Sequence, residues 1–331
     1  MTAREHEGVT APSALHRRAL GGLILATCFW SLSFPVVKGM VLVHDRLLPG
    51  AGHWFVAAQI VGPRFLLAGV LLFLWAPRMI LGATARELRQ GLLLGVFNAA
   101  GMIFQVDGLE FTSASVSAFL TQFSAILIPA VVALRTRRWP APLVWLCASL
   151  VLAGVAILGR FDFHLLRFGR GELETLLSAA FFMVQIFVLE SPAFAGNRVQ
   201  PVSAVMFGLE GLLFLGLALG TAAHPADCLV PWTAVSWIAS TGMLTFLCTL
   251  GAFMLMNHWQ PKVTATEAGL IYCLESVFAA LLALFLPAYL SRWIGFDYPN
   301  EAVTWQLLVG GGLITLANVA LQLKPAPRAA R

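Results

Sequence analysis

The feature that most constrains this chain is a succession of apolar segments, each about long enough to cross a lipid bilayer, separated by short turns that carry polar residues or arginine. A transmembrane helix needs about 20 mostly apolar residues. The composition agrees, because 59% of the 331 residues are hydrophobic and only 11% are charged, whereas about a quarter of the residues of a soluble domain are charged. The pattern therefore predicts an all-α polytopic membrane protein.

About ten segments have this length and character, which predicts about ten transmembrane helices. The predicted segments are Ala19–Val43, Trp54–Ala76, Leu88–Val106, Thr112–Leu134, Pro142–Leu158, Leu173–Leu189, Val202–Thr221, Trp232–Met256, Thr264–Leu286 and Trp305–Leu323. A basic stretch precedes the first segment, as it does in a signal peptide. That segment is longer than the about 7–15 apolar residues of a signal peptide, so we expect it to be the first helix of the bundle.

The positive residues in the turns predict how the helices are oriented, because short cytoplasmic loops are rich in Lys and Arg. If the N-terminus is cytoplasmic, most Lys and Arg residues fall on the cytoplasmic side. The turn from Arg160 to Arg170 is the exception, since it carries three Arg residues on the opposite side. The distribution predicts a multi-pass protein of the bacterial inner membrane, with cytoplasmic N- and C-termini and an even number of helices.

An even number of about ten helices divides into two sets of five, which suggests an internal repeat. A shift of about 150 residues pairs Gly101 with Gly251 and Leu120 with Leu270. If the halves are homologous, an odd number of helices in each gives them opposite orientations, as in the inverted repeats of many secondary transporters. The predicted organisation is a cytoplasmic N-terminal tail (1–18), a first five-helix repeat (19–160), a second five-helix repeat (161–323) and a cytoplasmic C-terminal tail (324–331).

Four local strings occur in order on the predicted helices. They are Trp-Ser-Leu-Ser-Phe-Pro-Val-Val-Lys at 30–38, Arg-Phe-Leu-Leu-Ala at 64–68, Gln-Val-Asp-Gly-Leu-Glu-Phe-Thr-Ser-Ala-Ser at 105–115 and Glu-Ser-Val-Phe-Ala-Ala-Leu-Leu at 275–282. With these strings the chain resembles the EamA family of the drug/metabolite transporter superfamily over nearly its whole length. The resemblance implies ten helices in two inverted five-helix repeats, a central cavity lined by both halves, and export or exchange of small metabolites.

The chain departs from the family pattern at three places. Ser276 stands where family members commonly have Pro, and Glu210 lies near a position that is commonly Gln. The acidic residue that usually closes the fourth helix is replaced by Arg135-Thr136-Arg137-Arg138. These departures bear on the substrate more than on the fold.

Four ionisable residues stand out inside the predicted helices, where a charge costs several kcal/mol unless it is paired or hydrated. Arg64 is near the midplane, so it either pairs with a carboxylate or binds an anionic group of a substrate. Glu275, at a similar depth, either holds and releases a proton during transport, contacts substrate, or makes a structural hydrogen bond or a pair with Arg64. Glu210 is either a site residue or a packed, protonated carboxyl. Lys38, near the outer end of its helix, either reaches the interface or contacts a ligand.

Further candidates are uncharged. Polar cavity candidates are Asn98, Gln105 and Gln185, and candidate aromatic walls are Trp30, Phe119, Phe182 and Tyr272. Pro35 removes a backbone hydrogen bond and is expected to bend the first helix as part of a gate. The spacings Gly91-x-x-x-Gly95 and Gly216-x-x-x-Gly220 predict faces on which helices pack closely.

Several classes of function lack their signatures. No Gly-x-x-x-x-Gly-Lys-Ser/Thr string is present, which argues against ATP-driven transport by this chain itself. The positive charge is scattered rather than gathered in a basic stripe, so no nucleic-acid partner is predicted. His44, Asp45 and His53 give only a weak indication of a metal site. The sequence predicts no enzyme activity and no cofactor.

The pattern favours a secondary active transporter that exports or exchanges a small metabolite, such as an amino acid or another amphipathic carboxylate. Transport would proceed by alternating access around a midplane cavity, with Arg64, Glu210 and Glu275 as its charged residues. The alternative is an integral membrane enzyme or binding protein that acts on a lipid or lipid-linked substrate. The expected partners are a small metabolite and the lipid bilayer, and proton coupling and homodimer formation are both compatible with the sequence.

Overall fold

The computed structural model describes residues 14–111, 117, 120–159, 169–294 and 297–322, and this part of the chain contains helices and no strand. The helices of the first half are α1 (Ala14–Leu47), α2 (His53–Trp75), α3 (Pro77–Leu81), α4 (Ala85–Phe111), α6 (Ser124–Thr136) and α7 (Pro142–Leu158). The next helices are α8 (Arg170–Glu190), η2 (Pro192–Phe194), α9 (Val199–Thr221), η3 (Pro225–Thr233), α10 (Val235–Met243), η4 (Leu244–Gly251) and α11 (Ala252–Trp259). The last helices are η5 (Gln260–Lys262), α12 (Ala265–Tyr272), α13 (Leu274–Ala283), α14 (Leu286–Ile294) and α15 (Trp305–Gln322).

Seven helical stretches in the described residues are long and apolar enough to cross a membrane. They are Ala14–Leu47, His53–Trp75, Ala85–Gly108, Arg170–Glu190, Val199–Thr221, Val235–Lys262 and Ala265–Ala283. Three shorter apolar helices, Ser124–Thr136, Pro142–Leu158 and Trp305–Leu321, lie in the remaining predicted segments. The predicted all-α chain with several membrane-length helices is therefore confirmed. The total of about ten crossings and the inverted repeat stay predictions.

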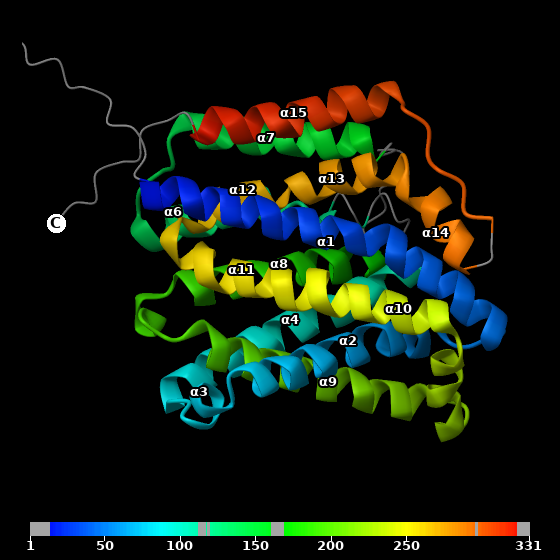
Figure 1. Ribbon diagram of the computed structural model, residues 1–331. Helices are drawn as coiled ribbons and strands as arrows, with labels where there is room; N and C mark the ends of the chain where they lie inside the picture. The colour runs from blue at the N-terminus through cyan, green and yellow to red at the C-terminus, as the bar shows by residue number, and fades with distance from the viewer. Residues whose placement is uncertain (1–13, 112–116, 118–119, 160–168, 295–296, 323–331) are drawn as a thin grey trace, which may run out of the picture.

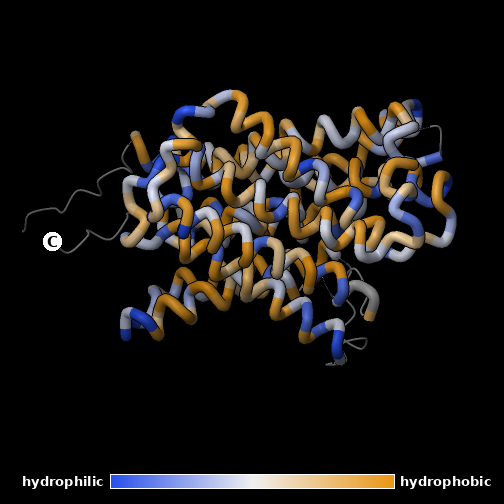
Figure 2. Tube along the Cα trace, turned by 90° about the horizontal axis from the view of Figure 1, so that it is seen from below, coloured by the Kyte–Doolittle hydropathy of each residue, from blue (hydrophilic) through white to orange (hydrophobic). Residues whose placement is uncertain are grey.

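The long helices run side by side and form a bundle (Figure 1). The pair α7 and α15 forms one edge of the bundle, and α2, α3 and α9 form the opposite edge, with α1, α11 and α13 between them. The first turn of α1 and the last turn of α15 lie at the same end of the bundle. Hydrophobic residues run along the helices, whereas the most hydrophilic residues lie mainly toward the two ends (Figure 2).

Local sequence signals explain where several helices begin. Before α4, the side chain of Glu87 accepts a hydrogen bond from the backbone N–H of Thr84 (2.8 Å), and the Thr84 hydroxyl accepts one from the backbone N–H of Glu87 (3.2 Å). Thr264 and Glu267 make the same reciprocal pair at the start of α12. These capping boxes satisfy N–H groups that the first turn leaves without a helical partner. A proline begins α7, where no such N–H is needed.

Glycines allow the closest contacts between helices. A Cβ atom on Gly91 would lie 2.6 Å from Cβ of Val205, and one on Gly95 would lie 3.1 Å from Cδ2 of Leu209, so α4 packs tightly against α9 as predicted. The matching prediction for Gly216 and Gly220 is wrong, because a Cβ atom at either position would meet nothing within 4 Å. Both glycines lie on the exposed face of α9, where a bilayer has room for side chains.

One predicted helix is interrupted. The segment Thr264–Leu286 was expected to be continuous, but it forms α12 and α13 with a turn at Cys273 between them. The backbone N–H of Cys273 bonds to the carbonyl of Leu270, three residues back, at 3.2 Å. This tighter spacing ends the regular α-helical ladder. As a result, Glu275 lies in the first turn of a new helix.

Candidate functional site

A buried carboxyl group lies between α4 and α9. The Asn98 side-chain amide donates a hydrogen bond of 2.8 Å to Oε2 of Glu210, and the Glu210 side chain is completely buried. The second oxygen of Glu210, Oε1, has no hydrogen-bond partner among the described residues. Two of the residues predicted for the site are therefore in direct contact, with one carboxyl oxygen left to interact with something else.

Arg64 lies in the middle of α2, roughly 16 Å along the helix axis from its first residue. Its guanidinium Cζ is 5.2 Å from the centre of the Phe65 ring, and its Nε is buried without a hydrogen-bond partner in the described part of the chain. The residue as a whole is partly accessible. No carboxylate among the described residues is within ion-pair distance of it, although Glu210 is near enough to interact with it electrostatically. The close pairing with a carboxylate that the sequence left open does not form.

Glu275 is partly accessible and lies in the first turn of α13. Its backbone carbonyl accepts a hydrogen bond of 2.9 Å from the Ser31 hydroxyl, which joins α1 to α13. Cys248 of η4 lies near both Arg64 and Glu275. The two charged residues therefore lie near the same π-helical stretch without forming an ion pair with each other. Short π-helical segments are frequent at functional sites.

A chain of aromatic rings connects this region to α1. The Trp30 ring lies edge-on to Phe253 and to Tyr272, with centres 5.2 Å and 5.4 Å apart, and Phe253 in turn contacts Phe65 at 5.6 Å. The indole N–H of Trp30 is buried and has no partner among the described residues. Trp30 and Tyr272, both predicted as aromatic walls, thus lie together and reach the neighbour of Arg64.

The hydroxyl group of Tyr272 belongs to a polar network. Its hydroxyl donates to Oε1 of Gln260 at 2.6 Å, and the Gln260 amide donates to the carbonyl of Ile186 at 2.9 Å. Gln260 is completely buried, and the network joins α12, η5 and α8. Sequence reasoning missed Gln260, because the following Pro261-Lys262 suggested a turn at the membrane surface. Phe65 and Phe253 were missed because isolated aromatic residues in apolar segments are usually core.

The remaining polar candidates belong to α4, α8 and the segment after α4. Gln105 donates a long hydrogen bond of 3.5 Å to the Thr121 hydroxyl. Gln185 is buried, and its Nε2 has no partner among the described residues. Phe182 packs over Gly101, where an added Cβ would lie only 2.5 Å from the ring. Phe119 lies outside the described residues.

The candidates for gating lie on α1. Pro35 is buried, and α1 continues as a helix through it from Ala14 to Leu47. Lys38 is exposed and lies beside Tyr298, with its Nζ 5.5 Å from the centre of that ring.

The weak indication of a metal site receives no support, since no group of three or more His, Cys, Asp or Glu side chains in the described residues is arranged to hold a metal ion. His44 instead packs against Phe55 and Trp237, with ring centres 5.6 Å and 5.8 Å apart.

A second polar region ties α4 to the loop before α9. The Arg198 side chain donates to the Glu87 carboxylate through Nε at 2.7 Å and Nη2 at 2.8 Å, and the Arg198 backbone N–H donates to it at 3.0 Å. Hydrogen bonding to Glu87 raises the pKa of the Arg198 guanidinium further above its usual range. Asn197 donates to Gln90 at 2.8 Å, and Arg86 donates to the carbonyl of Ala195. We call this set the α4–α9 latch.

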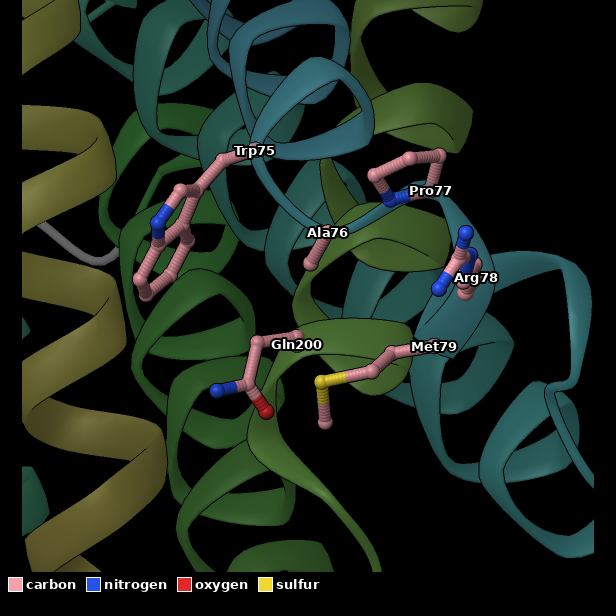
Figure 3. A pocket seen from close by; sticks show the side chains of 6 residues that line it. All are labelled: Trp75, Ala76, Pro77, Arg78, Met79 and Gln200. Carbon is pink, nitrogen blue, oxygen red and sulfur yellow. The ribbon is translucent and has the colours of Figure 1, made fainter.

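Two surface depressions of about 470 Å³ each lie beside the latch. The α2–α9 groove is lined by Trp75, Ala76, Pro77, Arg78, Met79 and Gln200. The α9–α11 groove is lined by Asn197, Arg198, Val199, Gln200, Met254, Leu255, His258 and Trp259. In the first groove, Met79 and Gln200 lie close together, with Trp75 on one side and Arg78 on the other (Figure 3). None of the predicted site residues lines either groove.

Comparisons with known proteins agree with this picture. Residues 17–160 match the EamA-like transporter family. An uncharacterized transporter of Archaeoglobus fulgidus is 25% identical over 315 residues, which cover 92% of this chain and 85% of that protein. A solved crystal structure has the same fold, with a TM-score of 0.69 and 17% identity over 93% of this chain and 98% of that one. The fold and these likenesses define a membrane transporter with multiple apolar helices, and the names point to a transporter rather than an enzyme. The predicted resemblance to the EamA family is confirmed.

Proposed function

We propose that this protein is a secondary transporter of the bacterial inner membrane that exports or exchanges a small amphipathic carboxylate, such as an amino acid. The observation that carries this proposal is Arg64, a partly accessible guanidinium in the middle of a membrane-length helix. Its Nε has no protein partner among the described residues. An unpaired charge is costly in an apolar surrounding. A substrate carboxylate would remove this cost, because it accepts two parallel N–H bonds from a guanidinium.

The surroundings of Arg64 favour a substrate that also has an apolar part. Phe65, Phe253 and Trp30 form a continuous aromatic surface that begins beside the guanidinium. Sites for small molecules typically combine such apolar walls with a few polar groups that fix orientation. The buried indole N–H of Trp30 offers one more donor for an acceptor atom of the substrate.

The proposed inverted repeat is supported by the way the helices pair. If α1, α2, α4, α6 and α7 correspond in order to α8, α9, α10–α11, α12–α13 and α15, the contacts of one half map onto those of the other. Two contacts, α2–α9 and α7–α15, join helices that correspond to each other in the two halves. The contact of α4 with α8 in one half corresponds to the contact of α11 with α1 in the other. Arg64 and Glu210 each lie eleven residues after the first residue of their helices, at equivalent positions. The three shorter apolar helices complete ten crossings on this assignment.

Alternating access requires each end of the bundle to open in turn. The end at which α1 begins carries the α4–α9 latch and the Tyr272–Gln260–Ile186 network, which would have to separate or rearrange when that end opens. We assign this end to the cytoplasm, because α3, the turn between α6 and α7 and the turn before α9 lie there (Figure 1), and these segments carry Arg78, Arg138 and Arg198. Glu210 and Glu275 are the groups proposed to exchange a proton, since each lies in the membrane interior without an ion-pair partner among the described residues.

The proposal is tested with purified protein in sealed vesicles, by measuring flux of labelled amino acids and organic acids. Replacing Arg64 with Ala should reduce flux of carboxylate substrates at limiting concentration by about ten- to hundredfold, the effect of losing a hydrogen bond to a charged group. The control is Arg138→Ala, an exposed arginine outside the helices. Unchanged flux in the Arg64 variant would make Arg64 a structural residue. A chemically altered product would indicate the alternative, a membrane enzyme.

A further inference from the structure

The α9–α11 groove combines an apolar wall with a polar rim. Val199, Met254, Leu255 and Trp259 supply the apolar surface, while Asn197, Arg198, Gln200 and His258 supply polar atoms. It lies where α9 begins and α11 ends, at one end of the long apolar helices. It is separate from Arg64, which lies in the middle of α2 and does not line the groove.

Two cations beside the groove have no carboxylate partner. Lys262 Nζ lies 4.0 Å from the centre of the Trp259 ring and 2.7 Å from Nε2 of His258, and no carboxylate in the described part of the chain is within ion-pair distance of it. Arg78 is exposed in the neighbouring α2–α9 groove, which shares Gln200, and is likewise unpaired among the described residues (Figure 3). Arg198 differs, because Glu87 already neutralises it.

The groove lies at the ends of apolar helices, where the headgroup layer of a bilayer is expected. Trp75, the last residue of α2, lines the α2–α9 groove, and Trp259, the last residue of α11, lines the α9–α11 groove. Tryptophan at helix ends is typical of the boundary between hydrocarbon and headgroups. A molecule in the α9–α11 groove would therefore place its apolar part against Met254 and Leu255 and its polar part beside Lys262.

We propose that these features form a binding site for an anionic phospholipid. The phosphate group lies beside Lys262, His258 and the Gln200 amide, with Arg78 attracting it from the adjacent groove, and an acyl chain lies along Met254 and Leu255. Basic pockets between transmembrane helices on the cytoplasmic side suit anionic headgroups, which are concentrated in that leaflet. The lipid would fill the space beside the α4–α9 latch, since Arg198 belongs to both.

The test is native mass spectrometry of the full-length protein released from detergent, with phosphatidylglycerol added and phosphatidylcholine as the uncharged comparison. Lys262→Gln and Arg78→Gln should each weaken phosphatidylglycerol binding by about fivefold, the effect of one basic residue near an anionic membrane surface. Arg138→Gln removes an exposed charge in the turn between α6 and α7, outside both grooves, and should leave binding unchanged. Equal losses in all three variants would overturn the proposal, because they would show attraction to net charge alone.

A second variant keeps the charge and fills the groove. Leu255→Trp should weaken phosphatidylglycerol binding as well, because the acyl chain would lose its place against α11. A site for free phosphate would behave differently, since excess inorganic phosphate would displace the lipid and Leu255→Trp would have no effect; that result would overturn the assignment to a lipid. Binding is measured without transport, so the outcome stands apart from the role of Arg64.

Discussion

The two ends of α4 are held by ion pairs of different character. In its first turn, Glu87 is only 4% exposed and bonds to the Nε, Nη2 and backbone N–H of Arg198. Near its last turn, Asp107, which is 15% exposed, pairs with Arg170, which is 59% exposed and also bonds to Glu174 at 2.7 Å; Arg198, by comparison, is 39% exposed. The buried carboxylate depends on its partner, whereas water can replace the partner of the exposed pair. The comparison indicates that α4 is fixed firmly at one end and loosely at the other.

The largest effect should come from Glu87→Gln, which leaves Arg198 without its carboxylate. Glu87 is nearly buried, but water screens Arg198, which is 39% exposed. The expected loss therefore lies between the about 1 kcal/mol of an exposed pair and the about 3–5 kcal/mol of a fully buried one. Thermal unfolding in detergent measures it. The pKa of Arg198 is raised in the folded protein. The stabilisation from its positive charge is therefore complete below the pKa of Arg198 in the unfolded chain, and it is lost only as pH rises through the higher pKa of the folded protein.

The same variant therefore has a pH control. The difference in melting temperature between wild type and Glu87→Gln should stay constant from neutral pH to about pH 9, well below the titration of an arginine. A difference that disappears over this range would show that the firm end of α4 is not held by Arg198.

A second experiment tests packing at the same end of α4. Gly91→Ala would bring a methyl group to 2.6 Å from Cβ of Val205 and 2.7 Å from the carbonyl oxygen of Val202. Overpacking of this kind costs about 1–3 kcal/mol. Gly216→Ala is the matched control, since a methyl group there meets nothing within 4 Å. Equal melting temperatures for the two variants would contradict close packing of α4 on α9.

The smallest effect is expected at the loose end of α4. Asp107→Asn should lower stability by less than about 1 kcal/mol, as for other exposed ion pairs, and the difference should shrink further at high salt. Melting temperatures at low and high ionic strength measure it. A loss as large as that of Glu87→Gln would remove the distinction between the two ends.

The sequence predicted the helices better than their contacts. Pro142–Leu158 was predicted with the bounds that α7 has, because Pro142 begins the apolar run and Gly159 follows it. The turn at Cys273 was missed, since nothing in the apolar run around it distinguishes a tight turn from a continuing helix. The pattern of apolar residues is the same whether a backbone N–H bonds four residues back or three, so it cannot predict this turn.

The site was predicted in part for a related reason. The cost of an ionisable residue in hydrocarbon identified Arg64, Glu210 and Glu275 from the sequence alone, and their roles as site residues stay predictions. Which groups meet could not be deduced, because Asn98 and Glu210 are 112 residues apart and Glu87 and Arg198 are 111 residues apart. Arg198 served only to assign the side of a turn, whereas the structure gives it a buried carboxylate partner.

The close contacts of α2 with α9 and of α7 with α15 have a mechanical consequence. In each pair a glycine brings backbone against backbone: Gly62 would place a Cβ 3.2 Å from the N atom of Leu215, and Gly154 would place one 2.7 Å from the O atom of Gly310. The α2–α9 and α7–α15 pairs lie on opposite edges of the bundle (Figure 1). An axis through the α2–α9 and α7–α15 contacts would allow the two proposed halves to rotate relative to each other. Rotation about this axis would keep both helix contacts intact. The same rotation would widen the bundle at one end and narrow it at the other.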